Sequence, residues 1–434
     1  MAQYRKDKHE YLPDGKTIFE TVMLADQYGN VVGSANPTGM AVDAFGRARV
    51  SQPLTLFDSA HRYRDNGKIT TFISASVATV AHNANAGLIE CTLDTTSGSF
   101  VKRESSRVFS YQPGKSLLIL QTFVFSAAKT GLRQRYGYFN EQNGIFLQLS
   151  GNELSFIERS YVSGSTVETK VTQANWNVDV MDGTGPSRKV LDISKAQIMF
   201  IDIEWLGLGT VRTGFVIDGQ FIHCHSFHHA NKIQSTYITT ACLPVRAEVE
   251  NISATASNST LKIVCASVMS EGGYELRGRP RTIGNLPTGA NQYAMASAGT
   301  FYPVTAIRLN PSNIDAIVIP KEISVMPISS GFYQLKIVAG ADMTGAVWAN
   351  VASDSSVQYN TNASATFSGG TDQFSLYFNS TNQSAAGVNL GDGIFKYQLE
   401  RNSFSNTPYT FILAITSSTA SANVCAALSW EEVS

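Results

Sequence analysis

The stretch FIDIEWLGLGTVRTGFVIDGQFIHCHSF, residues 200–227, holds three apolar runs of strand length separated by two turn signals. Gly207 and Gly209 mark the first turn, and the Asp218–Gly219 pair marks the second. Asp-Gly pairs favour the positive-φ geometry of a tight hairpin. Within the runs, apolar residues tend to recur at every second position, which is the period of a strand with one buried face. The stretch therefore predicts three consecutive antiparallel strands.

The same alternation continues along the chain, while a sustained helical period is absent. The clearest further strand patterns are residues 71–80, 115–126, 196–207, 408–417 and 423–432. The run at 115–126 is apolar at nearly every position, which is typical of a strand buried on both faces. Many short strands with regular turns predict an all-β fold: an antiparallel jelly roll or β-sandwich followed by a second β-sandwich.

Composition divides the 434 residues into four segments. Residues 1–50 have few core-sized apolar runs and predict an extended N-terminal docking arm. Residues 51–270 carry the densest strand pattern and predict the jelly-roll domain. Residues 271–291 are rich in Gly, Pro and Arg, which indicates a linker. Residues 292–434 predict the C-terminal β-sandwich domain.

The charge balance limits the choice of partners. The formal net charge is −1, with 33 basic and 34 acidic residues, so no long-range field attracts nucleic acid or an anionic membrane. In this neutral chain, Arg277, Arg279 and Arg281 are expected to contact an acidic protein surface during assembly or to lie in a solvated linker, rather than to bind phosphate. No stretch approaches the roughly 18 apolar residues of a membrane span. The five scattered cysteines predict buried thiols rather than a disulfide framework.

Four of the seven histidines fall in HCHSFHH, residues 223–229. Period two sends His223 and His225 to one face of the strand and Cys224 to the other. Cupin-type jelly rolls hold a metal with such an H-x-H pair, together with further ligands from other strands. We favour half-buried rings that bond backbone and polar neighbours, and therefore expect no cofactor. His223 and His225 stay as alternative metal candidates.

Asp202 and Glu204 project to the same face of the strand at 200–205. The segment is similar to the E-x-D-x-E strand of laminarinase-type glycoside hydrolases, in which the first Glu is the nucleophile and the last Glu the acid/base. Phe200 stands at the first position here, so a double displacement lacks its nucleophile. We therefore expect no enzyme and no catalytic residues, and keep a degenerate or active glycosidase using Glu204 as the second alternative.

Several segments, taken in order, resemble a family of virion structural proteins of tailed bacteriophages. These segments are residues 43–59, 135–160, 175–187, 201–219 and 225–251. The likeness runs from about residue 40 to about residue 280, and the closing run at 423–432 is similar to the last strand of the C-terminal sandwich in such proteins. The central domain also resembles a concanavalin-type jelly roll. No catalytic residues are implied by this resemblance.

The resemblance implies a building block of the head, collar or tail, acting as a docking, decorating or fibre component. Its partners would be other virion proteins and copies of itself in a homo-oligomer, after synthesis in the host cytoplasm. The first alternative is a glycan-binding, receptor-recognition protein of the virion. In that case the aromatic rings of Tyr359, Phe374, Tyr377 and Phe378 are expected to stack on sugars from C-terminal loops.

Overall fold

A computed structural model describes residues 52–74, 78–272, 278–284, 292–380, 386–389 and 398–433. The chain divides into two compact units, residues 1–52 and 53–434, and all strands below belong to the second unit. The predicted arm, residues 1–50, lies outside the described residues. Within the described part, one 3₁₀ turn at Gln173–Asn175 is the only helical element, and no helix is long and apolar enough to cross a membrane.

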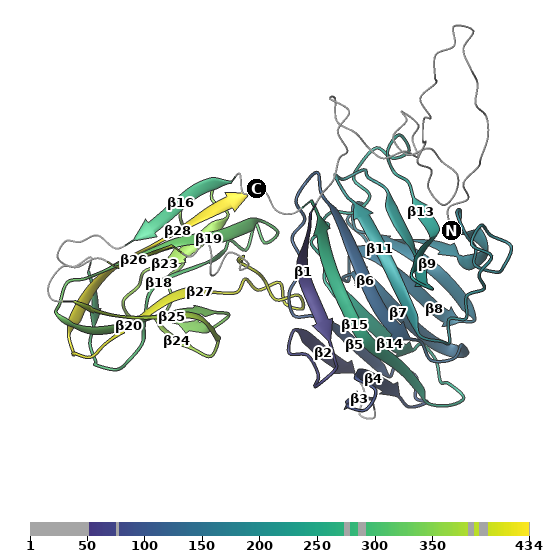
Figure 1. The fold of residues 1–434 in the computed structure, drawn as a ribbon, viewed down its shortest axis with the longest axis horizontal. Coiled ribbons are helices and arrows are strands. Elements are labelled where there is room, and N and C mark those ends of the chain that lie inside the picture. The colour runs from purple at the N-terminus through teal and green to yellow at the C-terminus, as the bar shows by residue number, and fades with distance from the viewer. Residues whose placement is uncertain are drawn as a thin grey trace, which may run out of the picture. The chain divides into compact units, whose positions relative to one another are not determined.

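The first sandwich contains an eight-stranded antiparallel sheet. In spatial order its strands are β13 (Gln220–Phe227), β12 (Val211–Ile217), β11 (Gln197–Glu204), β6 (Ser116–Val124), β15 (Ser259–Glu271), β4 (Leu88–Leu93) and β3 (Thr79–Asn83), with β1 (Pro53–Ala60) also paired to β15. Figure 1 shows β1, β15, β6 and β11 side by side in one layer.

A seven-stranded antiparallel sheet forms the second layer. Its strands in spatial order are β10 (Val167–Thr172), β9 (Glu153–Ser160), β8 (Gly144–Gly151), β7 (Lys129–Phe139), β14 (Val245–Asn251), β5 (Phe100–Ser105) and β2 (Ile69–Ser74). The pattern at 71–80 is therefore not one strand: its start belongs to β2 in this sheet and its end to β3 in the other. The two-residue alternation of a sequence does not show to which sheet each half of the run 71–80 belongs.

Side chains from both sheets form one core between them. Strand β6 places Leu117, Ile119 and Phe123 in this core, with no exposed area, while the alternate residues of the strand are half-buried. The prediction that 115–126 is buried on both faces is therefore wrong, because the outer face of its sheet is only partly covered. Each fully buried Leu, Ile or Phe side chain contributes about 1.5–3 kcal/mol to folding. No disulfide joins the five cysteines; four are buried, as predicted, whereas Cys265 is half-buried.

The second sandwich also consists of two antiparallel sheets. One holds β16 (Arg279–Gly284), β28 (Ala422–Val433), β19 (Ile317–Pro327) and β26 (Ala386–Asn389), with β17 (Tyr293–Met295) also paired to β28. The other, called here the six-stranded sheet, holds β22 (Ala349–Asn350), β23 (Val357–Asn360), β18 (Tyr302–Leu309), β27 (Phe411–Ser417), β20 (Gly331–Ala339) and β25 (Thr371–Ser380). A separate two-stranded sheet, formed by β21 (Asp342–Thr344) and β24 (Thr366–Ser368), also belongs to the second sandwich.

These two antiparallel sandwiches confirm the predicted fold class. The predicted linker is wrong in part, because residues 279–284 form β16 and pair with β28 over its whole length. The closing run behaves as predicted: Val424, Ala426, Leu428 and Trp430 all lie in the second core.

The stretch at 200–227 forms the meander β11–β12–β13, as its turn signals predict. Asp218 and Gly219 have φ values of 54° and 74°, which is the signature of a type I′ hairpin turn. At the first turn, a side-chain carbon on Gly209 would lie 1.9 Å from the backbone oxygen of Glu204. Only glycine fits this close approach, so the paired glycines are a requirement of the turn.

Candidate functional site

Phe200, Asp202 and Glu204 lie on the outer face of β11, opposite the core, as the alternation predicts. The guanidinium of Arg212, directly across on β12, donates a hydrogen bond to the Asp202 carboxylate. Burial raises the pKa of Asp202 above its usual value, and Arg212 only partly opposes this. The carboxylate at the Asp position of the E-x-D-x-E motif is thus held in an ion pair.

The other two positions of the motif have different surroundings. The ring of Phe200 packs against the ring of Phe221 on β13, with centroids 5.2 Å apart. Glu204 is exposed at the end of β11, beside Ser116, whose hydroxyl donates to Glu271 at 2.8 Å. This face therefore combines an aromatic contact with an acidic edge, and an apolar ring occupies the place of the missing nucleophile.

A β-bulge separates His223 from His225. The register pairs His223 with Gly214 and His225 with Thr213, so Cys224 is an extra residue on β13. His225 lies on the core face, where its ring packs edge-on against the ring of Phe227 with centroids 4.5 Å apart. His223 lies on the outer face. The prediction that both imidazoles share a face is wrong, because a bulge shifts the two-residue period by one.

Each ring of this pair already has polar neighbours. The backbone N–H of Asn177 donates to His225 Nδ1 at 3.3 Å, and His223 Nε2 lies 2.9 Å from the Ser226 hydroxyl oxygen. Burial lowers the pKa of His225 to about 4, so the ring is neutral at pH 7. Within the described residues, no group of three or more His, Cys, Asp or Glu side chains is arranged to hold a metal ion.

The last histidine of the cluster, His229, is buried at the end of the first sandwich. Its Nε2 lies 2.7 Å from the Glu158 carboxylate and its Nδ1 2.5 Å from the Gly209 carbonyl oxygen. Its ring stacks on Tyr237, with centroids 4.0 Å apart and planes within 6°. Burial acts to lower the pKa of His229, but the hydrogen bond and negative charge of Glu158, together with the bond to the Gly209 carbonyl, outweigh it and raise the pKa. This histidine ties the β13 exit to β9 and to the first turn.

The outer face of the seven-stranded sheet carries a network of ion pairs, called here the charge ladder. It contains five basic residues (Lys102, Arg133, Arg135, Arg159, Arg246) and five acidic residues (Glu104, Glu141, Glu168, Glu248, Glu250). The side chain of Arg246 is at the centre, 2.6 Å from Glu104, 2.9 Å from Glu141 and 3.3 Å from Glu248. Because the charges balance, this face presents no net field.

The ladder also perturbs its own carboxyl groups. Burial raises the pKa of Glu104, although Arg246 opposes the shift. For Glu141, burial also acts to raise the pKa, but Arg246 and Lys102 overcome it and lower the pKa to about 2. The two acids show that position inside the network, rather than residue type, decides the sign of the shift.

Two aromatic rings lie beneath the arginines of the ladder. The rings of Phe139 and Phe146 pack with centroids 4.3 Å apart and planes tilted by 33°. With Ile157 they form a small buried cluster separate from the main core. The guanidinium of Arg159 lies 5.4 Å and 4.9 Å from the two ring centres, and Arg246 lies 5.4 Å above Phe139. These are cation–π distances. The arginines thus cover apolar surface as well as pairing with acids.

The four aromatic residues expected to bind sugars face in different directions. Phe374, Leu376 and Phe378 on β25 alternate toward the second core, and the ring of Phe378 stacks on Tyr333 at 5.5 Å. Tyr359 on β23 also packs against this core. Only Tyr377 among the four points outward, with 73% of its surface exposed. These residues belong to strands, not to loops as expected.

The arginines expected at an assembly contact already have a partner inside the second sandwich. Arg279 and Arg281 on β16 both donate to the carboxylate of Asp354, the second at 2.7 Å. Arg277 lies outside the described residues. The assembly contact stays a prediction, and Asp354 would compete with any acidic partner surface.

Residues 398–409, called here the clasp, belong to the second sandwich in sequence but bond to the first. Gln398 donates to the Ser110 hydroxyl at 2.7 Å and Ser403 to the Ser105 carbonyl at 2.6 Å. The Glu400 carboxylate pairs with Arg107. Burial raises the pKa of Glu400, and Arg107 opposes the shift. Hydrogen bonds and one half-buried ion pair thus fix the clasp to the segment that follows β5.

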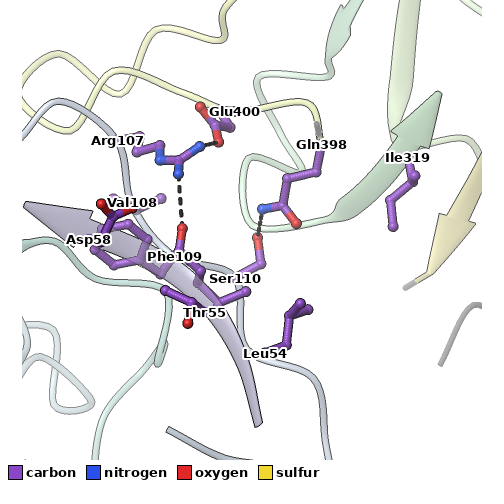
Figure 2. Close-up of a pocket in the computed structure, with 11 residues that line it drawn as sticks. Leu54, Thr55, Asp58, Arg107, Val108, Phe109, Ser110, Ile319, Gln398 and Glu400 are labelled. Carbon is purple, nitrogen blue, oxygen red and sulfur yellow. Dashed lines mark hydrogen bonds and ion pairs between the residues drawn. The ribbon is translucent and has the colours of Figure 1, made fainter. Parts of the chain in front are cut away.

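A cavity of about 300 Å³ lies beside the clasp. Its wall includes Leu54 and Leu56 of β1, Phe109, and Ile319 of β19. Figure 2 shows the Arg107 guanidinium beside the Glu400 carboxylate. The same guanidinium donates to the Leu56 carbonyl of β1 at 2.9 Å. Arg107 thus contacts both β1 and the clasp beside this cavity.

No known protein-family profile matches the chain, and no curated protein sequence matches it. Among solved structures, it is similar to the CBM2 module of the evolved Dit of Lactobacillus casei BL23 phage J-1 (5% identity, 52% of this chain and 100% of that chain, TM-score 0.34). It is also similar to a carbohydrate esterase from Shiga toxin-encoding bacteriophage phi24B (13%, 50% and 99%, 0.30) and to peanut lectin (11%, 51% and 98%, 0.28). These similarities cover about half of the chain, and at such TM-scores they leave the function open.

Proposed function

We propose that this chain is a structural, non-catalytic protein of a tailed-bacteriophage virion. It would serve on the head, collar or tail as a docking or decorating component, with other virion proteins and copies of itself as partners. The sequence resemblance between about residue 40 and about residue 280 supports this proposal. Its segments cover all of β8, β9, β12 and β14 and parts of β1, β7, β11 and β13, so they contribute to both sheets of the first sandwich.

The observation that carries the proposal is the clasp. The chain passes from the first sandwich to the second near residue 278, and the clasp adds a second, non-covalent connection through Gln398, Glu400 and Ser403. A further bond joins Thr240 to Asp315 at 2.6 Å. Two connections resist bending better than one, which suits a component that carries mechanical load.

The outer face of β11 supports a role without catalysis. A retaining glycosidase needs two carboxyl groups about 5–5.5 Å apart, one as nucleophile and one as acid. Here Phe200 packs on Phe221 at the nucleophile position, and Asp202 is paired with Arg212. Of the two carboxylates on this strand, only that of Glu204 is exposed. A glycosidase would have to recruit a second acid from outside the motif.

Mass spectrometry of gradient-purified virions of the encoding phage tests the proposal. We expect peptides from both sandwiches at a stoichiometry of several copies per particle, and a matching density in an electron cryo-microscopy map. A phage DNA-replication protein serves as the negative control. If the chain is abundant in the infected-cell lysate but missing from particles that contain the capsid protein, the proposal is wrong.

A further inference from the structure

Two large aromatic rings are exposed next to each other on the six-stranded sheet of the second sandwich. Phe332 on β20 and Tyr377 on β25 have 70% and 73% of their surface exposed. The register pairs Phe332 with Asn379 and Gln334 with Tyr377, so the two rings occupy diagonal positions on one face. Diagonal neighbours on adjacent strands are about 7–8 Å apart, within reach of aromatic side chains. An exposed pair of this kind calls for an explanation.

Uncharged polar groups surround the two rings. A shallow groove of about 470 Å³ is lined by nine residues, among them Gln334, Thr416 and Ser418, and none of the nine is ionisable except for the tyrosines. Among the described residues, the Thr416 hydroxyl is buried and has no hydrogen-bond partner. Lys336, two residues after Gln334 on β20, is paired with Asp372 at 2.7 Å. The groove therefore offers rings, hydroxyls and amides, and no free charge.

We propose that the groove between Phe332 and Tyr377 binds a neutral oligosaccharide. The apolar faces of sugar rings stack on aromatic side chains, while their hydroxyls exchange hydrogen bonds with amides and hydroxyls such as those of Gln334 and Ser418. This inference rests on the proposed virion role, to which it adds a ligand class for the second sandwich. Phe332 was not among the residues that the sequence singled out.

The lining favours a neutral sugar over other occupants. An acidic polysaccharide would need unpaired basic groups, and Lys336 is already paired. A stable protein partner would need about 20–30 residues on each side, whereas nine line this groove. A short saccharide matches both the size and the absence of charge.

Binding is measured on the full chain by titration with maltohexaose, cellohexaose, mannohexaose and chitohexaose, followed by calorimetry and NMR. We expect at least one of them to bind with a Kd of about 1 mM or tighter. Tyr377→Ala and Phe332→Ala should each weaken that binding at least about tenfold, whereas Phe72→Ala, a matched exposed ring on the first sandwich at 47% exposure, should leave it unchanged. Because both rings are exposed, the variants should keep the wild-type unfolding temperature.

Three results would overturn the inference. One is the absence of binding to all four sugars. Another is binding that survives both alanine variants, which would place the site elsewhere. The third is self-association by analytical ultracentrifugation that Tyr377→Ala abolishes, which would make the patch a contact between copies. The virion test is independent of all three, so the two proposals fail separately.

Discussion

Replacing Arg246 with Met removes the centre of the charge ladder. Arg246 and Glu104 have 2% and 1% of their surface exposed, and the guanidinium lies within 3.3 Å of three carboxylates. Methionine keeps much of the length and apolar contact of the stem but leaves Glu104 buried without its cation. Breaking a buried pair from one side costs about 3–5 kcal/mol. We expect a loss of that size in the free energy of unfolding at pH 7.5.

The pH dependence follows from Glu104. Burial already raises its pKa in the wild type, and losing Arg246 raises it further. A carboxyl whose folded pKa lies above its unfolded value binds more protons when folded, so lower pH stabilises the folded state relative to the unfolded one. The cost of Arg246→Met should therefore shrink between pH 7.5 and pH 5.

Guanidinium chloride unfolding, followed by tryptophan fluorescence, measures this loss, since Trp176 is buried in the first core. Arg133→Met is the matched control on the same face. Its pair with Glu250 has 29% and 27% side-chain exposure, and such pairs contribute less than about 1 kcal/mol. If Arg246→Met costs no more than Arg133→Met, or if its cost grows as pH falls, the ladder does not stabilise the sheet as argued.

Three further predictions use other parts of the chain. Gly137→Val should prevent folding of the first sandwich, because a side-chain carbon there would lie 2.4 Å from Phe146; soluble expression with a native circular dichroism spectrum would contradict it. Arg107→Ala with Glu400→Gln should increase hydrogen exchange of the clasp at least about tenfold without unfolding either sandwich, and unchanged exchange would argue against the clasp. Burial lowers the pKa of His61 and His225 from 6.5 to about 4. Their contribution to the free energy of unfolding should therefore be fully present above pH 6.5 and be lost as the pH falls toward 4. His225→Gln should reduce this dependence of the free energy of unfolding on pH.

Part of the candidate site follows from the alternation of residue types in the sequence, and the charge ladder shows the same kind of alternation. The same-face placement of Asp202 and Glu204 follows from period two and is confirmed. The charge ladder also has a period-two signal, since charged and uncharged residues alternate along RQR (133–135) and RAEVE (246–250). What the pattern could not show is that these strands are neighbours, because β5, β14 and β7 pair across more than a hundred residues of chain.

The aromatic residues of the second sandwich show the limit of composition. Tyr377 and Phe378 are adjacent in sequence, yet one is exposed and the other packs on the core. Phe332 gave no sequence signal, because a single exposed phenylalanine is ordinary in a strand. It became a candidate only when the register of β20 and β25 placed it diagonal to Tyr377.

The sequence by itself determined the all-β class, the hairpin turn at Asp218–Gly219 and the core face of most strands. These are local properties, since they depend on backbone preferences and on the two-residue period of a strand. The tertiary structure alone decided the bulge that separates His223 from His225, the pairing that assembles the ladder, and the clasp. Each of these depends on which distant strand or segment lies alongside, and that choice is made by packing of the whole sandwich rather than by any run of neighbouring residues.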